Sequence, residues 1–334
     1  MPTTVTSSIG TSSRDYSTLQ AWDDAAPANL VTSDQIWRGE CYNDSLFTGA
    51  LTIAGSTSDA TRYKELTCAA GQSFMDNASV QTNELRFNQS NGVGVSRSTN
   101  YAPVVTLDEA YCRVSKIQVA FTGSSGSAIT SHSGTPKTNT VIDFCISEAS
   151  ANAGPTSAYG STQIIRNTLM VNRGTSPSQI AGLRNGASMV NCTLVATKAA
   201  ATVALVGAYS AATVKNCAIF NCTAVGSGTA ANYTTCYTSA ASPPTGCTQV
   251  AYDTSTGSGF ENTTDSTRDF RIKSTSAMIN VGTTDATNAP IDIAGTSRPS
   301  GAAYDVGCWE YVSAGAAFKA AKPTVIGQAI GGMY

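Results

Sequence analysis

The chain repeats one six-residue pattern, as CRVSKI (112–117), VIDFCI (141–146), IIRNTL (164–169), MVNCTL (189–194) and VKNCAI (214–219). The segments can be aligned on their last residues, which are all apolar and lie 29, 23, 25 and 25 residues apart: Ile117, Ile146, Leu169, Leu194 and Ile219. Each segment begins with a residue that suits an apolar interior: Cys112, Val141, Ile164, Met189 or Val214. A period of this length is typical of stacked repeats, in which each unit buries its apolar face only against its neighbours.

The composition favours β-structure and excludes some partners. Charged residues make up 13% of the 334 residues, against about 25% in ordinary soluble domains. Small polar residues replace them, which suits a β-structure better than long helices. The net charge of −2 gives no basic footprint for nucleic acid or anionic lipid. We therefore expect no nucleic-acid partner and no membrane partner.

The N-terminus and the cysteines indicate a reducing compartment. Met1-Pro2-Thr3-Thr4 lacks the basic start and apolar core of a secretory signal, so we expect synthesis in a cytoplasm. None of the ten cysteines forms a Cys-x-x-Cys pair. Cys192 and Cys217 share one repeat position and would lie one rung apart, about 4.8 Å, which permits a disulfide. A reducing cytosol favours a ladder of buried thiols instead.

Short strands and one short helix surround the repeat. Ser17 can cap a helix in which Leu19, Trp22 and Ala26 share one face, and this helix can cover an exposed end of stacked coils. Strands of 4 to 6 residues are expected at 35–39, 50–54, 65–69 and 103–107. The long helices that an α/β sheet needs as crossovers are missing.

The sequence therefore predicts an all-β fold, a right-handed parallel β-helix, in three parts. The expected parts are an N-terminal arm with its capping helix at 1–30, the β-helix at 31–312 with less regular coils at 225–265, and an extended apolar C-terminal arm at 313–334.

Two further stretches carry a family resemblance. Asp269-Phe270-Arg271, Met278-Ile279-Asn280-Val281-Gly282, Arg298-Pro299 and Asp305-Val306-Gly307-Cys308-Trp309-Glu310 resemble the closing turns of pectate-lyase-like right-handed β-helix proteins. The stretch from Asp15 to Trp22 is similar to the start of β-helix proteins encoded by tailed bacteriophages. The resemblance implies a virion component that is synthesised in the cytoplasm of a bacterial host. From the residues themselves, Asp305 and Glu310 are expected to accept turn amides or to pair with Arg298.

Four carboxylates are the candidates for catalysis. A glycosidase needs two carboxyl groups about 5 to 10 Å apart, and the chain offers Asp108 with Glu109 and Asp143 with Glu148, near the same repeat position on neighbouring coils. No recognisable catalytic motif contains them, so solvated strand-edge positions are the favoured interpretation. We therefore favour a protein that is not an enzyme; if it is an enzyme, we expect a polysaccharide hydrolase or lyase.

Other chemistry has little support in the sequence. His132 is the only histidine, so a Ser-His-Asp triad or a zinc site would depend on it alone, and its loop favours an exposed imidazole. No phosphate-binding loop or nucleotide motif is present. We expect no metal and no cofactor.

The C-terminal residues are the candidates for partner docking. After Lys322 the chain has three glycines and no charge, and its apolar residues are Val325, Ile326, Ile330, Met333 and Tyr334 among others. Such an arm either folds back along the rod or inserts into a neighbouring subunit, where an extended segment gives a large contact area.

These observations lead to three functional hypotheses. The preferred one is a structural virion protein of a tailed phage, a head decoration or cement component that assembles with itself, as a homotrimer by analogy with other phage β-helices, and with capsid or other virion proteins. The alternative is a tailspike or tail-fibre protein that cleaves a host surface polysaccharide in an acidic groove lined by Tyr111 or Trp37. The third is a glycan-binding module without turnover.

Overall fold

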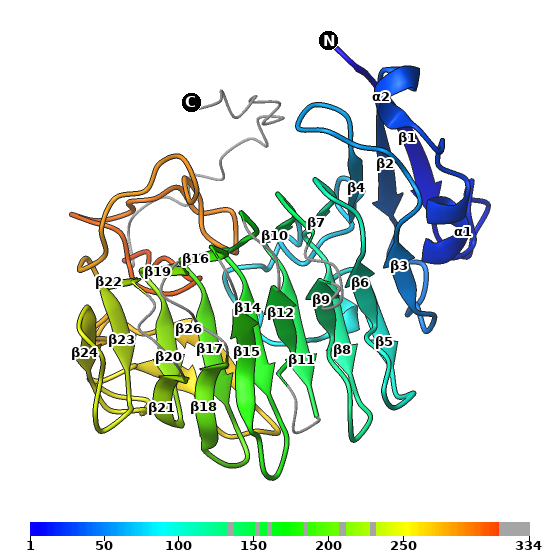
Figure 1. The fold of residues 1–334 in the computed structure, drawn as a ribbon. Coiled ribbons are helices and arrows are strands. Elements are labelled where there is room, and N and C mark those ends of the chain that lie inside the picture. The colour runs from blue at the N-terminus through cyan, green and yellow to red at the C-terminus, as the bar shows by residue number, and fades with distance from the viewer. Residues whose placement is uncertain are drawn as a thin grey trace.

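The computed structural model describes residues 1–131, 137–150, 154–158, 162–183, 186–206, 212–227 and 232–313. The chain coils about seven times into a parallel β-helix with three sheets (Figure 1). The expected all-β fold is therefore confirmed. His132 and the C-terminal residues from 314 onward lie outside the described residues.

From β4 to β21, each coil passes through the three sheets in the same order. The first sheet contains β1 (Thr3–Ile9), β2 (Gln35–Cys41), β4 (Lys64–Cys68), β7 (Arg113–Ser115), β10 (Val141–Asp143), β13 (Ile164–Arg166), β16 (Ser188–Val190), β19 (Thr213–Lys215) and β22 (Asn232–Thr234). The second contains β5 (Gly94–Arg97), β8 (Gln118–Phe121), β11 (Ile146–Ala149), β14 (Leu169–Asn172), β17 (Thr193–Ala196), β20 (Ala218–Phe220), β23 (Cys236–Thr238) and β24 (Cys247–Gln249). The third contains β3 (Leu51–Ile53), β6 (Val105–Leu107), β9 (Ile129–Ser131), β12 (Thr156–Ala158), β15 (Gln179–Leu183), β18 (Ala201–Val206) and β21 (Cys222–Ser227). Strands thus form at all four places predicted from the sequence.

A left-handed residue makes the corner between the first and second sheets. Asn167, Asn191 and Asn216 occupy this corner in successive coils, with φ of 46°, 49° and 52°. Asparagine adopts this conformation more readily than most residues that have a Cβ. The corner therefore explains why an asparagine recurs in three of the aligned segments.

The coil register differs from the sequence alignment by one residue at two steps. The structure pairs Ile165 with Met189 and Met170 with Leu194, so the anchor Leu169 lies opposite Thr193. In a strand, a shift of one residue exchanges the two faces. Leu194 faces the interior, whereas Leu169 lies on the outer face of the second sheet. Alignment on large apolar residues failed because the interior column contains small side chains.

The N-terminal residues cap one end of the stack. β1 extends the first sheet beside β2, so the sheet begins before the expected boundary at residue 30. Helix α1 (Leu19–Asp24) buries Leu19 and Trp22, and a second short helix, α2 (Leu30–Ser33), follows it. Thr18, not Ser17, caps α1, by accepting the Ala21 amide at 3.1 Å. A Cβ on Gly39 would lie 2.7 Å from the Trp22 ring, so only glycine lets the helix approach this closely.

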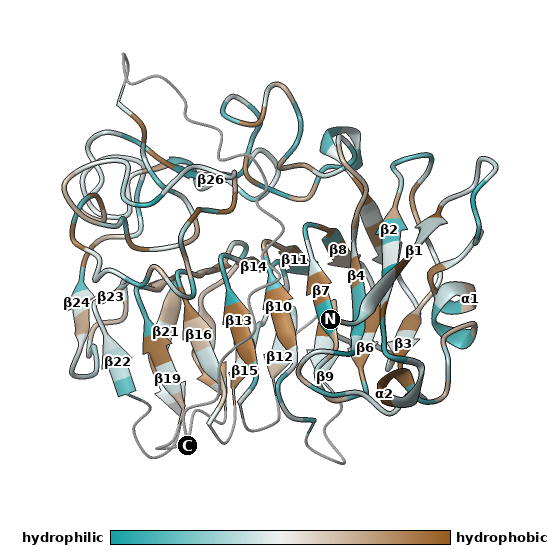
Figure 2. Cartoon of the chain, turned by 90° about the horizontal axis from the view of Figure 1, so that it is seen from above, coloured by the Kyte–Doolittle hydropathy of each residue, from teal (hydrophilic) through white to brown (hydrophobic). Residues whose placement is uncertain are grey.

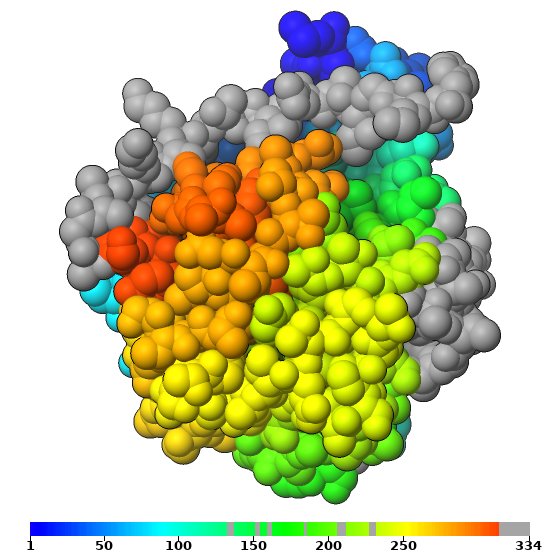
Figure 3. All heavy atoms as spheres, turned by 90° about the vertical axis from the view of Figure 1, so that its left-hand side faces the viewer, coloured from blue at the N-terminus to red at the C-terminus, as the bar shows by residue number. Residues whose placement is uncertain are grey.

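Residues 250–313, here named the C-terminal strap, do not add coils. Its strands β25 (Phe260–Asn262) and β26 (Asp269–Ile272) form a separate antiparallel pair. The strap packs on the outer face of the second sheet, together with the loop from residue 69 to 93 that contains the 3₁₀ helix η1 (Gln89–Asn91). Figure 2 shows the strap and β26 on one side of the stacked strands, with α1 at the end opposite β24. Figure 3 looks at the β24 end, where the yellow part of the chain forms much of the face and the orange part of the strap lies beside it.

Aromatic contacts explain why the strap folds back. Phe220, on the outer face of β20, meets Phe260 edge-on with ring centroids 5.4 Å apart, and Phe260 meets Phe270 at 5.2 Å. Such pairs add about 0.5–1.5 kcal/mol each to the free energy of burial. Strands β8, β11, β14 and β17 are consequently buried on both faces. The expected closing turns are thus a covering layer and not the end of the coil.

Candidate functional site

The predicted pair Asp143 and Glu148 is separated by a corner of the β-helix. Asp143 ends β10 on the outer face of the first sheet, and Glu148 lies on the outer face of the second sheet, in β11. Phe144, with φ of 50°, makes the corner between them. The two carboxylates therefore face different sides of the molecule, and each has its own cationic partner.

Asp143 is bound by the next coil. Its carboxylate accepts from Arg166 Nε at 2.8 Å and from Asn167 Nδ2 at 3.3 Å. Burial raises the pKa of Asp143, and the Arg166 charge opposes that rise. The pair joins two rungs of the first sheet.

Glu148 is bound by the C-terminal strap. Arg268 Nη2 contacts Glu148 Oε2, and the Phe87 amide donates to Oε1 at 2.9 Å. The side chains of Arg268 and Glu148 are 5% and 4% exposed. An ion pair this deeply buried leaves no room for substrate at the carboxylate, and it attaches the strap to the sheet.

Asp108 and Glu109 also have separate partners. Asp108 pairs with Lys137 at 3.1 Å in a partly exposed position. Glu109 lies 3.4 Å from Lys64 Nζ and accepts the Ser56 amide at 2.9 Å. Burial raises the pKa of Glu109.

Lys64 joins Glu109 to the N-terminal cap. Its ammonium group contacts Asp23 of α1 at 2.8 Å and the Ala54 carbonyl oxygen, and its side chain is 1% exposed. Burial raises the pKa of Asp23, against the Lys64 charge. This cluster was not predicted from the sequence. Lys64 alternates with the inward-facing Leu66 and Cys68, and a lysine at such a core position of a strand is unusual enough to have indicated a buried ion pair.

A third buried charge cluster lies inside the strap. Arg298 Nη1 pairs with Glu310 Oε2 at 3.0 Å. Asp305 accepts the amides of Asn280 at 2.7 Å and Tyr311 at 2.5 Å. The predicted role of Asp305 and Glu310 as acceptors of turn amides and partners of Arg298 is confirmed.

Burial shifts the acid–base behaviour of this cluster. It raises the pKa of Asp292, whose carboxylate accepts the Ala294 amide at 2.9 Å, to about 6. Burial and the nearby Glu310 charge raise the pKa of Asp305 to about 7. These groups titrate near neutral pH because they are enclosed, and they hold backbone amides rather than a ligand.

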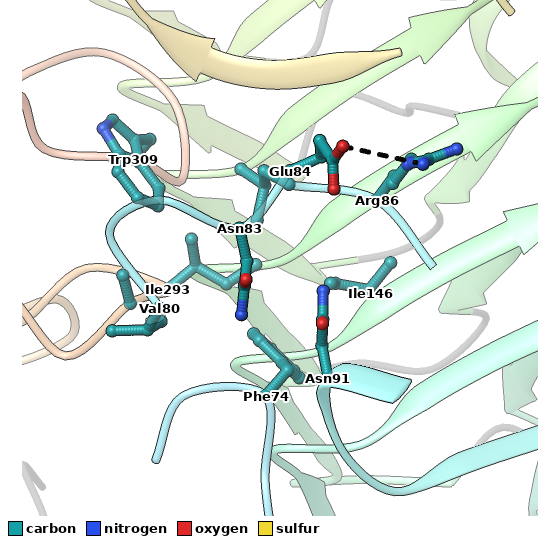
Figure 4. Close-up of a pocket in the computed structure, with 11 residues that line it drawn as sticks. Phe74, Val80, Asn83, Glu84, Arg86, Asn91, Ile146, Ile293 and Trp309 are labelled. Atoms are coloured by element: carbon teal, nitrogen blue, oxygen red, sulfur yellow. Dashed lines mark ion pairs between the residues drawn. The ribbon is translucent and has the colours of Figure 1, made fainter. Parts of the chain in front are cut away.

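One small pocket lies between the strap and the second sheet (Figure 4). Its volume of about 20 Å³ is room for about one water molecule and lies far below the roughly 300 Å³ at which small-molecule sites begin. Glu84 is the one carboxylate that lines it, and Arg86 pairs with Glu84 at 3.8 Å. Asn83 Nδ2 and Arg86 Nε are buried without a hydrogen-bond partner among the described residues. The pocket therefore offers donors to one water molecule or one acceptor atom, and it lacks a second carboxylate for hydrolysis.

A second hollow of about 130 Å³ lies near the start of α1. Its lining mixes hydroxyl and apolar residues and contains no carboxylate, histidine or cysteine: Thr11, Ser17, Thr18, Leu19, Ser45, Leu46, Phe47, Thr48, Gly49 and Ala50. Its lining therefore supplies neither an acid–base pair nor a metal ligand set.

The remaining predicted site residues are not gathered in a groove. Trp37 is in the core and its indole donates to the Trp22 carbonyl oxygen at 3.1 Å, while Tyr111 is half-buried in another turn. The docking residues Val325, Ile326, Ile330, Met333 and Tyr334 lie outside the described residues. In the described ranges, no three His, Cys, Asp or Glu side chains are placed to hold a metal.

Comparisons with models of protein families, with curated proteins and with solved structures find no match. Within the part of the chain that the structure describes, no helix has the length and apolar character needed to span a membrane.

Proposed function

We propose that this protein is a rigid structural component of a tailed-phage particle, attached to the head as a decoration or cement protein. The observation that carries the proposal is how the charged side chains are paired. Every candidate carboxylate pairs with a cation, and the buried pairs of Lys64 and of Arg268 fasten the cap and the strap to the β-helix. A catalytic carboxyl group must reach its substrate, whereas a structural rod needs its peripheral segments held in place.

The phage assignment rests on the resemblance of the N-terminal and closing segments, and the fold is compatible with it. Under this proposal the protein is made in the host cytoplasm and resides in the virion. Its partners are further copies of itself, in a homotrimer, and capsid or other virion proteins. The apolar residues Val325, Ile326, Ile330, Met333 and Tyr334 supply the docking contacts.

Cryo-electron microscopy of intact particles, with mass spectrometry of their proteins, tests this function. We expect density for the β-helix on the outside of the head, repeated with the symmetry of the capsid. Absence of the chain from purified particles would overturn the virion assignment. Density confined to the tail would overturn the decoration role and favour the alternative.

A glycan-binding role on the tail is the second candidate. The unpartnered donors Asn83 Nδ2 and Arg86 Nε favour it, because the roughly 20 Å³ beside them admits a single acceptor oxygen, such as a hydroxyl or carboxylate of a glycan that lies across the pocket mouth. Calorimetry with host surface polysaccharide tests this role. Binding that Asn83→Leu abolishes would support it, and heat indistinguishable from that of buffer would exclude it for that glycan.

A further inference from the structure

A column of sulfur atoms runs through the interior of the β-helix. Register pairing places seven residues, one from each of successive strands in or beside the second sheet, in a single column: Ile117, Cys145, Thr168, Cys192, Cys217, Cys236 and Cys247. Four cysteines are therefore consecutive at the C-terminal end of the stack. All ten cysteines are free thiols in this structure, and the predicted stacking of Cys192 and Cys217 on neighbouring rungs is confirmed.

The column members Thr168, Cys192, Cys217 and Cys236 share one side-chain orientation. The Cys192 thiol donates to the carbonyl oxygen two residues earlier at 3.4 Å, and the corresponding distances are 3.3 Å for Cys217 and 3.6 Å for Cys236. Thr168 makes the same contact through its hydroxyl at 2.8 Å. Because the orientation repeats, neighbouring sulfurs follow the strand spacing of about 4.8 Å.

The last pair of the column, Cys236 and Cys247, differs from the others because one of its two thiols is partly exposed to solvent. Cys192, Cys217 and Cys236 are fully buried, whereas Cys247 is partly exposed. Cys247 begins β24, which pairs only with β23. A reagent in solution can therefore reach the column at Cys247 and not at the inner thiols.

The backbone already holds Cys236 and Cys247 together. They are direct register partners on parallel strands, and the Cys236 amide donates to the carbonyl oxygen of Gly246 at 2.9 Å. Register partners have Cα atoms about 4.8 Å apart, inside the range of about 4.4–6.8 Å that a disulfide spans. The contact with Cys236 is the largest cause of the raised pKa of Cys247, whereas contacts with Cys217 and Cys247 lower the pKa of Cys236 against the effect of burial, as expected for neighbouring sulfurs.

We propose that Cys236 and Cys247 are a redox-active pair that forms a reversible disulfide with a small-molecule disulfide such as glutathione disulfide. Cys247 is the partly exposed member of the pair; it loses its proton to solvent, and its sulfur attacks one sulfur of the oxidant, which gives a mixed disulfide and releases one glutathione thiolate. The Cys236 thiolate then attacks the Cys247 sulfur and displaces the second glutathione thiolate. Two protons leave the protein, two glutathione thiols form, and the protein disulfide is the oxidised product.

The disulfide fastens the edge of the second sheet. Without it, β24 is attached by a three-residue ladder to β23 alone. A covalent link within this short loop restrains the unfolded chain and resists fraying of the last strand. This inference does not depend on the proposed function, because it follows from the column and from the exposure of its last member.

Peptide mapping after oxidation of the folded protein tests the proposal. The native protein is treated with glutathione disulfide, remaining thiols are alkylated, and the chain is digested with chymotrypsin. Cleavage after Tyr233, Tyr237 and Tyr252 separates Cys236 from Cys247 and from the other cysteines. We expect the peptides 234–237 and 238–252 to be linked, a protein lighter by two hydrogen atoms, and reversal by dithiothreitol.

Matched variants distinguish this pair from the rest of the column. Cys247→Ser and Cys236→Ser should each abolish the link, and Cys308→Ser, in the strap, should retain it. Since Cys236 is buried, circular dichroism must first show that its variant folds; Cys247→Ser alone suffices if it does not. A link between Cys217 and Cys236, a persistent glutathione adduct on Cys247, or unchanged thiols would each overturn the proposal.

Discussion

Arg268 of the C-terminal strap pairs with Glu148 of β11, 120 residues earlier in the chain, and both side chains are almost completely buried. Arg268 also donates to the Asp265 carbonyl oxygen at 2.6 Å, and the Asp265 carboxylate in turn pairs with Arg173 of the β-helix at 2.9 Å. The strap is thus fastened by two linked ion pairs as well as by its aromatic contacts.

Arg268→Met should detach the strap from the second sheet. Removing one member of a buried pair leaves an uncompensated charge, which costs about 3–5 kcal/mol. We expect urea denaturation to show a lower midpoint and proteases to cleave the strap faster in the folded protein. Arg62→Met is the matched control, because the ion pair of Arg62 with Asp34 is exposed and such pairs contribute about 0–1 kcal/mol. Equal destabilisation by the two changes would contradict the assigned role of Arg268.

Asn191→Ala should destabilise the protein through two separate effects. The residue has φ of 49°, and its amide donates to the carbonyl oxygens of Asp305 at 3.1 Å and Gly307 at 3.3 Å. Alanine loses both bonds and also strains the corner, by about 1–2 kcal/mol. Asn191→Gly loses the bonds without that strain. In thermal denaturation, the stability of Asn191→Gly should therefore lie between that of the wild type and that of Asn191→Ala. Equal stability of the two variants would exclude strain at the corner.

The strap should become more stable as the pH falls from about 7 towards about 4. Burial raises the pKa of Asp292 to about 6 and that of Asp305 to about 7, so between these values and the ordinary pKa of 3.8 the folded state binds more protons than the unfolded state. Stability then decreases as the pH rises. Urea midpoints across this range test the sign. Asp305→Asn should reduce the change of the urea midpoint with pH. If the midpoint of this variant changes with pH as much as that of the wild type, other groups cause the pH dependence.

Below about pH 4 the opposite dependence is expected. Arg173 and Thr197 hold the pKa of Asp265 down to about 2, against the effect of burial. Protonation of Asp265 between the ordinary pKa and this value therefore weakens the strap. Arg173→Met should remove this acid sensitivity, and acid denaturation followed by circular dichroism measures it.

The purified protein should leave host surface polysaccharide at full length, because Asp143 and Glu148 face different sides of the β-helix and each binds an arginine. Size-exclusion chromatography of the glycan measures its length. Shortening by wild type that is lost in Asp143→Asn or Glu148→Gln would contradict this expectation and support the depolymerase alternative.

A chain that ends at Lys322 should fold but fail to attach to particles. The truncation removes the apolar docking residues and none of the described strands. Sedimentation with particles that lack the protein measures attachment. The full-length double variant Ile326→Asp/Ile330→Asp should fail in the same way, and undiminished attachment of the truncated chain would remove the arm from the proposal.

The β-helix architecture could be predicted from the sequence because the patterns that indicate its strands are local. Strands such as 35–39 and 103–107 have apolar alternation and β-branched residues between turn residues, and the missing crossover helices excluded an α/β sheet. The strand Thr3–Ile9 was missed, although its threonines and valine have high β-propensity. Aligning the repeat segments could not distinguish two strand registers that differ by one residue, because the inward-facing column is filled by cysteine and threonine instead of large apolar residues.

The candidate sites depended on contacts that lie far apart in the sequence. Arg268 and Glu148, or Lys64 and Glu109, are joined only because the chain coils and then folds back. A sequence pattern shows that a carboxylate is present but not which cation neutralises it. The closing segment was assigned to the coil for the same reason, since Phe260 and Phe270 look alike whether they fill an interior or cover an outer face.

The strap has a consequence for how the length of the rod is specified. Coils of one register could in principle be gained or lost by duplication, since each needs only its neighbours. The strap, however, contacts Ile146, Leu169, Val195 and Phe220 on four successive strands of the second sheet. Insertion or deletion of one coil would move each partner by one rung and leave the ion pairs and aromatic contacts unmatched. The strap therefore acts as a ruler that fixes the number of coils beneath it.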